Sequence, residues 1–151
     1  MMKRFFQSER GIAAIEFAMI LPVLTLILIG IADYGMFINQ RMKLQDLSRT
    51  ITQYVVQGGS DANVMADIVQ TSDFYTASIA KGQAVDVVTA TQCECAGGAT
   101  VSCTSSCAGY NDYVRHFYSA TVSGTYQPIF VYPGVSGSLQ LTGYSRIQYN
   151  P

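Results

Sequence analysis

The chain has 151 residues, a formal net charge of −1 and a single histidine, His116. From Asp33 onward, six Lys and Arg stand against eight Asp and Glu, a balance that argues against a nucleic-acid-binding face. No catalytic triad, paired carboxylates or glycine-rich phosphate loop is visible, so the sequence predicts neither an enzyme nor a bound cofactor or metal ion.

The first predicted element is a membrane-spanning helix over residues 12–32, where Glu16 is the only charged residue. As a helix this segment would be about 31 Å long at about 1.5 Å per residue, which matches a hydrocarbon core of about 30 Å. Lys3, Arg4 and Arg10 precede it, whereas the charges that follow it balance. The positive-inside rule therefore predicts a single-pass protein of the bacterial inner membrane, with a cytoplasmic N-terminus and a periplasmic C-terminal part.

Two other readings of this segment stay open. It could be a secretory signal cut after Ala32, or a plain uncleaved anchor. The apolar run is longer than the usual signal core of roughly 7–15 residues. Glu16 also costs several kcal/mol in hydrocarbon, roughly 3 on insertion scales, so it is normally retained for a purpose. The mature N-terminus would separate the readings: Asp33 for a secretory signal, Met1 for an anchor, and Ile12 for a specialised leader.

The residues at the start of the apolar run form a recognisable pattern. A basic leader ends in Gly11, and after four further residues comes the pair Glu16-Phe17. An early proline, Pro22, follows, and the apolar run is succeeded by the polar triplet Asp33-Tyr34-Gly35. Over residues 8–50 this pattern resembles the N-terminus of TadE-like proteins. These are pseudopilins, or minor pilins, of the tight-adherence (Flp type IVb) pilus system.

The resemblance implies that residues 1–11 are a leader, and that a prepilin peptidase cuts between Gly11 and Ile12. Glu16 and Phe17 would then be the fifth and sixth mature residues. A glycine before the cut leaves room for close approach of the peptidase to the backbone. The new α-amino group of Ile12 would lie one turn from Glu16, which by resemblance to type IV pilins sets the register between subunits. The alternative for Glu16 is a side chain that only snorkels to the headgroups.

The same resemblance implies the partners. They are the prepilin peptidase, the major Flp pilin with other pseudopilins, and the inner-membrane assembly platform of the pilus. The protein could be incorporated into the pilus itself.

Beyond the membrane the helix is predicted to continue to about residue 57, where Gly58-Gly59 ends it. An apolar stripe at helical spacing supports this prediction: Leu44, Leu47, Ile51, Tyr54 and Val55. The stripe could pack on the protein's own head or on a partner helix, and the sequence alone does not separate the two.

Residues 58–151 are predicted to form a small α+β head. Ser60 or Asp61 can cap a short helix over residues 62–70, and further helical turns are expected over 73–80. Strands are predicted over residues 84–91, 114–126 and 138–149, with breaks at Pro128 and Pro133-Gly134. The expected fold is pilin-like: a long N-terminal helix packed on an antiparallel sheet of three or four strands.

All four cysteines lie in one loop, residues 93–107: Cys93, Cys95, Cys103 and Cys107. In the periplasm they would form two disulfides. Three pairings are possible, and a hairpin would favour the nested one, Cys93–Cys107 around Cys95–Cys103. Zinc is a weaker alternative, because the Cys-x-Cys spacing is tighter than usual and His116 is the only histidine nearby. Free or redox-active thiols are a further alternative.

Two functions follow from these predictions. The first is an assembly subunit, cut at Gly11/Ile12 and needed to build a tight-adherence pilus. The second is a membrane-anchored or secreted binding module, unrelated to pili, whose contact surface is the stapled loop over residues 93–110.

Overall fold

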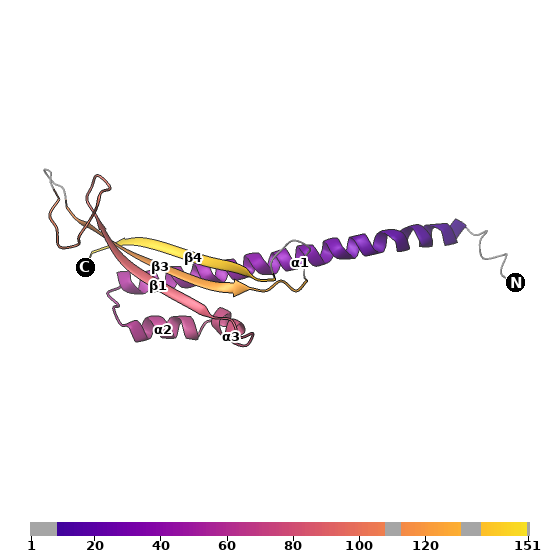
Figure 1. The fold of residues 1–151 in the computed structure, drawn as a ribbon, viewed down its shortest axis with the longest axis horizontal. Coiled ribbons are helices and arrows are strands. Elements are labelled where there is room, and N and C mark those ends of the chain that lie inside the picture. Colours follow the sequence, from indigo (N-terminus) through magenta and orange to yellow (C-terminus); the bar gives the residue numbers. More distant parts are fainter. Residues whose placement is uncertain (1–8, 108–112, 131–136, 151) are drawn as a thin grey trace.

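The computed structural model describes residues 9–107, 113–130 and 137–150. The predicted leader therefore lies outside the described residues up to residue 8, and so does the predicted break at Pro133-Gly134. The described part is one long helix with a small α+β head on its C-terminal half (Figure 1).

The long helix, α1, runs continuously over Glu9–Val56, which confirms the predicted stalk. It passes through Pro22, whose missing N–H removes one backbone hydrogen bond. One turn on, the Thr25 hydroxyl donates to the Leu21 carbonyl at 2.8 Å. The helix ends where Gly58 adopts a positive φ of 89°, and the Gly58 N–H donates to the Val55 carbonyl at 3.0 Å. Glycine suits this position because left-handed backbone carries no Cβ penalty there.

Two short helices follow, close to their predicted bounds. The first, α2 (Ala62–Gln70), is capped by the Asp61 carboxylate, which accepts from the Asn63 N–H. The second, α3 (Asp73–Ile79), is capped by the Ser72 hydroxyl, which accepts from the Tyr75 N–H. These caps satisfy N–H groups that have no partner inside the helix.

Four strands form the antiparallel sheet, in the order β2-β1-β3-β4. Their bounds are β1 Val85–Glu94, β2 Thr100–Val101, β3 Arg115–Tyr126 and β4 Leu139–Tyr149. The three long strands correspond to the three predicted ones. The short β2 was not predicted individually, and it pairs only with Cys93 and Glu94 of β1.

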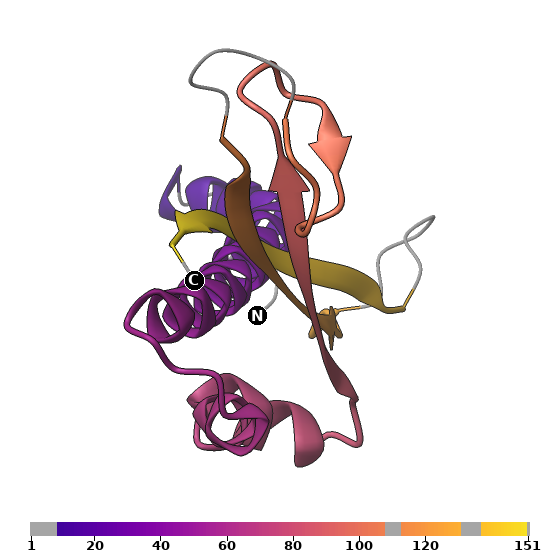
Figure 2. The ribbon, with the colours of Figure 1, turned by 90° about the vertical axis from the view of Figure 1, so that its left-hand side faces the viewer.

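All three helices lie on one face of the sheet, with α1 across β3 and β4 and with α2 and α3 beside β1 (Figure 2). The apolar stripe of α1 packs on this face, which answers the question that the sequence left open. Leu44 and Ile51 are fully buried there. The buried cluster joins α1, α2, α3, β3 and β4: Leu44, Ile51, Val69, Phe74, Ala120, Val122, Tyr126 and Leu141.

Small residues let α1 approach β4 very closely. A Cβ on Gly143 would lie 2.3 Å from the Leu44 backbone carbonyl, so only glycine fits at this crossing. Nearby, the buried hydroxyl of Thr52 hydrogen-bonds the Ser145 hydroxyl at 2.9 Å, so its polar group is satisfied.

We expect Gly143→Ala to destabilise the head by about 1–3 kcal/mol, because the added methyl meets backbone, which cannot rotate away. The measurement is the urea midpoint of the full chain in detergent micelles, followed by near-ultraviolet circular dichroism. Gly97→Ala is the matched control, because a Cβ there meets nothing within 4 Å. Equal midpoints for both variants would contradict the close approach of α1 to β4.

Candidate functional site on the N-terminal helix

The predicted processing residues lie in the first turns of α1, far from the head. Gly11 is inside the helix, two residues after its first residue, Glu9. Ile12 is 56% exposed and Phe17 60% exposed. Glu16 is exposed, and within the described residues it takes part in no ion pair. The structure thus places Gly11, Ile12, Glu16 and Phe17 in the first turns of α1, where the side chains of Ile12, Glu16 and Phe17 are exposed.

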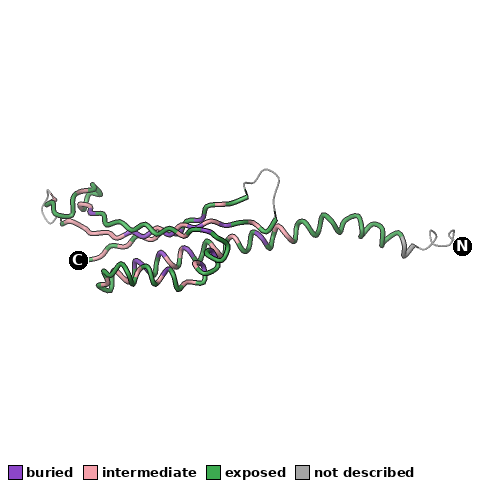
Figure 3. Tube along the Cα trace, turned by 60° about the horizontal axis from the view of Figure 1, so that its bottom comes forward, coloured by how far each residue is buried: buried purple, intermediate pink, exposed green. Residues whose placement is uncertain are grey.

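The apolar half of α1 is uncovered along its whole length. Residues 12–28 are all exposed, although almost all of them are apolar, and burial begins only at Ile29 and Gly30 (Figure 3). By length and composition α1 could span a membrane, and the described residues hold one such helix. An exposed apolar surface of this size is unfavourable in water, so lipid or other apolar helices must cover it.

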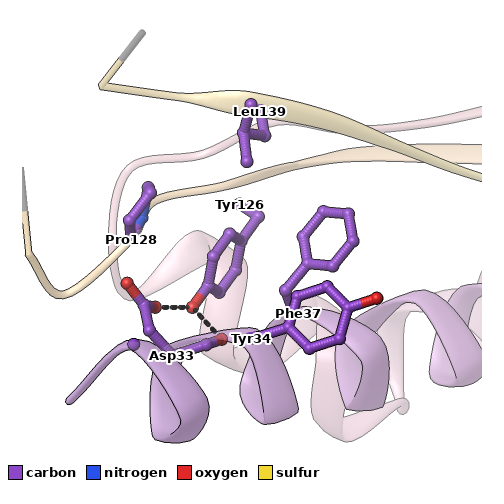
Figure 4. A pocket seen from close by; sticks show the side chains of 7 residues that line it. Asp33, Tyr34, Phe37, Tyr126, Pro128 and Leu139 are labelled. Carbon is purple, nitrogen blue, oxygen red and sulfur yellow. Dashed lines mark hydrogen bonds between the residues drawn. The ribbon is translucent and has the colours of Figure 1, made fainter. Parts of the chain in front are cut away.

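The head meets this helix at a buried carboxylate. Asp33 is only 4% exposed and comes directly after the apolar run. The Tyr126 hydroxyl lies 3.0 Å from the Asp33 backbone carbonyl and also donates to its carboxylate (Figure 4). The Ile129 N–H donates to the same carboxylate at 3.3 Å. A buried carboxylate is tolerated only when donors replace water, so these contacts fix the end of β3 against α1.

An apolar recess opens beside this junction. Its volume is about 390 Å³. It is lined by Gly30, Asp33, Tyr34, Phe37, Tyr126, Pro128 and Leu139. The Phe37 ring meets the Tyr126 ring edge-on at 5.7 Å between centroids, and the Tyr34 side chain is 65% exposed at the rim. The junction therefore combines hydrogen bonds with aromatic packing at the boundary of the apolar span.

The loop at the far end of the head carries two disulfides, but the nested pairing is wrong. The bonds are Cys93–Cys103 and Cys95–Cys107, with Cα–Cα distances of 5.1 and 5.7 Å. The register of the β1–β2 hairpin explains the difference. Cys93 lies opposite Val101, and the Cys95 N–H donates to the Ala99 carbonyl. The turn is therefore tighter than a nested pairing requires, and Cys103 comes back alongside Cys93.

His116 lies beside the first disulfide. Its Nδ1 is 3.2 Å from the Cys93 sulfur, and the potential ligand atoms of Cys93, Cys103 and His116 lie within 4.8 Å of one another. Both sulfurs are committed to the disulfide, so neither is a thiolate that could bind zinc. Arg115, which precedes His116 on β3, donates from its guanidinium to the Cys95 carbonyl at 2.6 Å. These contacts describe a stapled loop held to β3.

Sequence reasoning missed the junction. In the sequence, Asp33 counted as a flanking charge and as part of the polar triplet after the apolar run, and Tyr126 as the last residue of a strand. The available signal was the carboxylate itself, because an acid next to a membrane-length run needs a partner. Which tyrosine supplies that partner depends on the strand bringing residue 126 back to residue 33, a separation of 93 positions.

Comparison with known proteins supports the reading of α1. The family model described as TadE-like protein matches residues 11–52, so this match begins at Gly11 and covers most of α1. It confirms the TadE-like resemblance predicted from the N-terminal pattern. No curated protein matches the chain, and no solved structure matches it. The sheet and the disulfide loop lie outside the matched region.

We expect Tyr126→Phe to destabilise the head by about 1–3 kcal/mol, because a buried carboxylate loses a donor while the ring stays in place. The measurement is the urea midpoint of the full chain in detergent, together with amide hydrogen exchange at Asp33 and Tyr34. Tyr144→Phe is the control, because Tyr144 is 51% exposed on the opposite face of the sheet. Unchanged exchange in Tyr126→Phe would show that the hydroxyl does not hold the junction.

Proposed function

Because residues 11–52 are TadE-like, we propose that this protein is a minor pilin of the tight-adherence pilus system, required for assembly of the pilus. The observation that carries the proposal is the division of α1. Its first half, from the predicted cut onward, is apolar and uncovered, whereas its second half is packed under the head. Such a helix suits a subunit that is stored in a membrane and then moved into a bundle of similar helices.

The proposed maturation is a cut between Gly11 and Ile12 by a prepilin peptidase, so the protein is a substrate and not an enzyme. The bond lies in the first turn of α1, and helix ends open readily. Opening this turn to expose the bond would disturb no contact with the head, because the side chains of residues 12–28 are exposed. The leader would stay on the cytoplasmic side and the head on the periplasmic side.

The proposed role of Glu16 follows from the charge that the cut creates. The new α-amino group of Ile12 is one helical turn from the Glu16 carboxylate. In hydrocarbon both charges require partners, and removing one of a buried pair costs about 3–5 kcal/mol. A neighbouring pilin helix can place its own terminus against Glu16, and this pairing would set the axial register between subunits. The partners are then the major pilin, other pseudopilins and the assembly platform.

The first test is N-terminal sequencing of protein extracted from membranes of cells with and without a prepilin peptidase. We expect Ile12 as the first residue only when the peptidase is present. Gly11→Val should remain uncut, because the side chain obstructs close approach of the peptidase to the backbone. The control is Gly30→Val, where a Cβ meets nothing within 4 Å, and it should be cut normally. Asp33 or Met1 as the first residue in both strains would reject the proposal.

The second test concerns assembly. We expect Glu16→Ala to insert in the membrane and to be cut at Ile12, but to abolish piliation, which is measured by counting surface pili. The matched control is Glu9→Ala, because this carboxylate would leave with the leader and should not affect pili. Normal piliation in cells with Glu16→Ala would remove the register role and leave the maturation proposal standing.

A further inference from the structure

One edge of the sheet is open along most of its length. The short β2 covers β1 only at Cys93 and Glu94, so residues 85–92 of β1 have no neighbouring strand on this side within the described part of the chain (Figure 1). This edge contains no proline, and its only charged residue is Asp86. Val88 is 63% exposed and Val87 38% exposed. A long and nearly uncharged edge is the kind that proteins normally protect.

The hairpin register shows which backbone groups point outward. The Cys95 N–H donates to the Ala99 carbonyl, on the β2 side of the chain. In an antiparallel sheet, residues alternate between bonding one neighbour and the other, and β1 pairs with β3 without a bulge. The same side is therefore faced by the backbone groups of alternate residues: Val85, Val87, Thr89 and Thr91. These four residues offer an incoming strand its hydrogen bonds.

The opposite edge of the sheet is blocked at one residue of β4, Tyr144. The Gln45 side chain of α1 accepts from the Tyr144 N–H at 3.1 Å and donates to the Tyr144 carbonyl. One amide thus occupies both outward groups of a β4 residue, as a neighbouring strand would. A β1 edge of another copy would have to displace Gln45 in order to pair at this position, so the contact opposes a chain of identical heads.

Antiparallel pairing of β1 with β1 of a second copy is opposed by the direction of the strand. The β3 end at Tyr126 lies at Asp33, near the apolar span, and Val85 of β1 lies beside that end. Strand β1 therefore runs away from the span, as α1 does (Figure 1). Antiparallel β1–β1 pairing would point the two α1 helices in opposite directions, and two copies in one membrane cannot do so. This step rests on the membrane topology of the proposed function, whereas the backbone argument does not.

The surface beside the edge indicates the chemistry of the occupant. A recess of about 380 Å³ lies between α2 and β1. Its apolar lining includes Met65, Val69, Tyr75, Val85 and Val87. This part of the head is acidic, because it carries four exposed carboxylates while Lys81 is the only basic residue between positions 50 and 93. The four carboxylates are Asp61, Asp67, Asp73 and Asp86. None of the four carboxylates takes part in an ion pair within the described residues.

We propose that the β1 edge receives an extended strand from a different protein. Every second side chain of that strand is apolar and faces the recess beside α2, and its flanks are basic. Backbone hydrogen bonds at Val87 and Thr89 supply the affinity. The apolar recess and the negative charge of this part of the head supply the specificity, as in other cases of strand addition.

The test uses the full chain in detergent micelles and a fluorescent peptide of about nine residues, a usual strand length. The peptide alternates valine and threonine, with lysine at both ends, and its binding is measured by fluorescence anisotropy. We expect binding to the wild type that weakens with salt, and at least about tenfold weaker binding to Thr89→Pro, which loses an outward N–H. Thr89→Val keeps that N–H and is the matched control, with binding expected to be unchanged.

A second variant keeps the test interpretable if Thr89→Pro fails to fold. Val87→Lys keeps the backbone and places a like charge beside the recess, so it should also weaken binding of the lysine peptide while leaving the urea midpoint unchanged. Three results would overturn the proposal: wild-type strength in both Thr89→Pro and Val87→Lys, equal binding of a peptide with aspartate at both ends, or no binding to the wild type. Dimerisation of the wild type that the peptide displaces would assign the edge to a second copy instead, and would also reject the proposal. None of these results bears on cleavage at Gly11, so the proposed function is judged separately.

Discussion

The α1 helix is continuous, but its two halves need different surroundings: the first half is apolar on all sides, and the second half packs under the sheet. The rest of the structure depends on this constraint. Its first half presents apolar side chains around the whole helix, which only lipid or other apolar helices can cover. Its second half is apolar on one stripe, and the sheet covers that stripe with Val122 and Leu141. The helix has no break between the halves.

The junction between the halves explains how the head keeps a fixed position on such a helix. Aromatic packing alone would allow sliding, because apolar contacts are not directional. The contact of the Tyr126 hydroxyl with Asp33 is directional, and it joins a side chain of β3 to both the backbone and the carboxylate of α1. Further along, the crossing at Gly143 and the amide of Gln45 fix the same helix against β4. These contacts define the position and rotation of the head relative to the apolar half of α1.

The two edges of the sheet differ in how far their outward backbone groups are occupied. At β4, the α1 side chain of Gln45 occupies outward backbone groups that would otherwise attract a strand. At β1, the short β2 stops after two residues, because the chain turns away into the disulfide loop. An incoming strand would therefore meet fewer obstacles at β1 than at β4.

The sequence by itself determined the elements whose signals are local. The apolar run and the stripe containing Leu44 and Ile51 define the long helix, and Ser60-Asp61 marks the start of α2, because periodicity and capping act over a few residues. The tertiary structure decided every pairing between distant residues. Nothing near Asp33 specifies Tyr126, and the spacing of the four cysteines allows a nested pairing as readily as the interleaved one. These contacts depend on strand register and on how closely α1 approaches β4, and both are set only when the whole head packs.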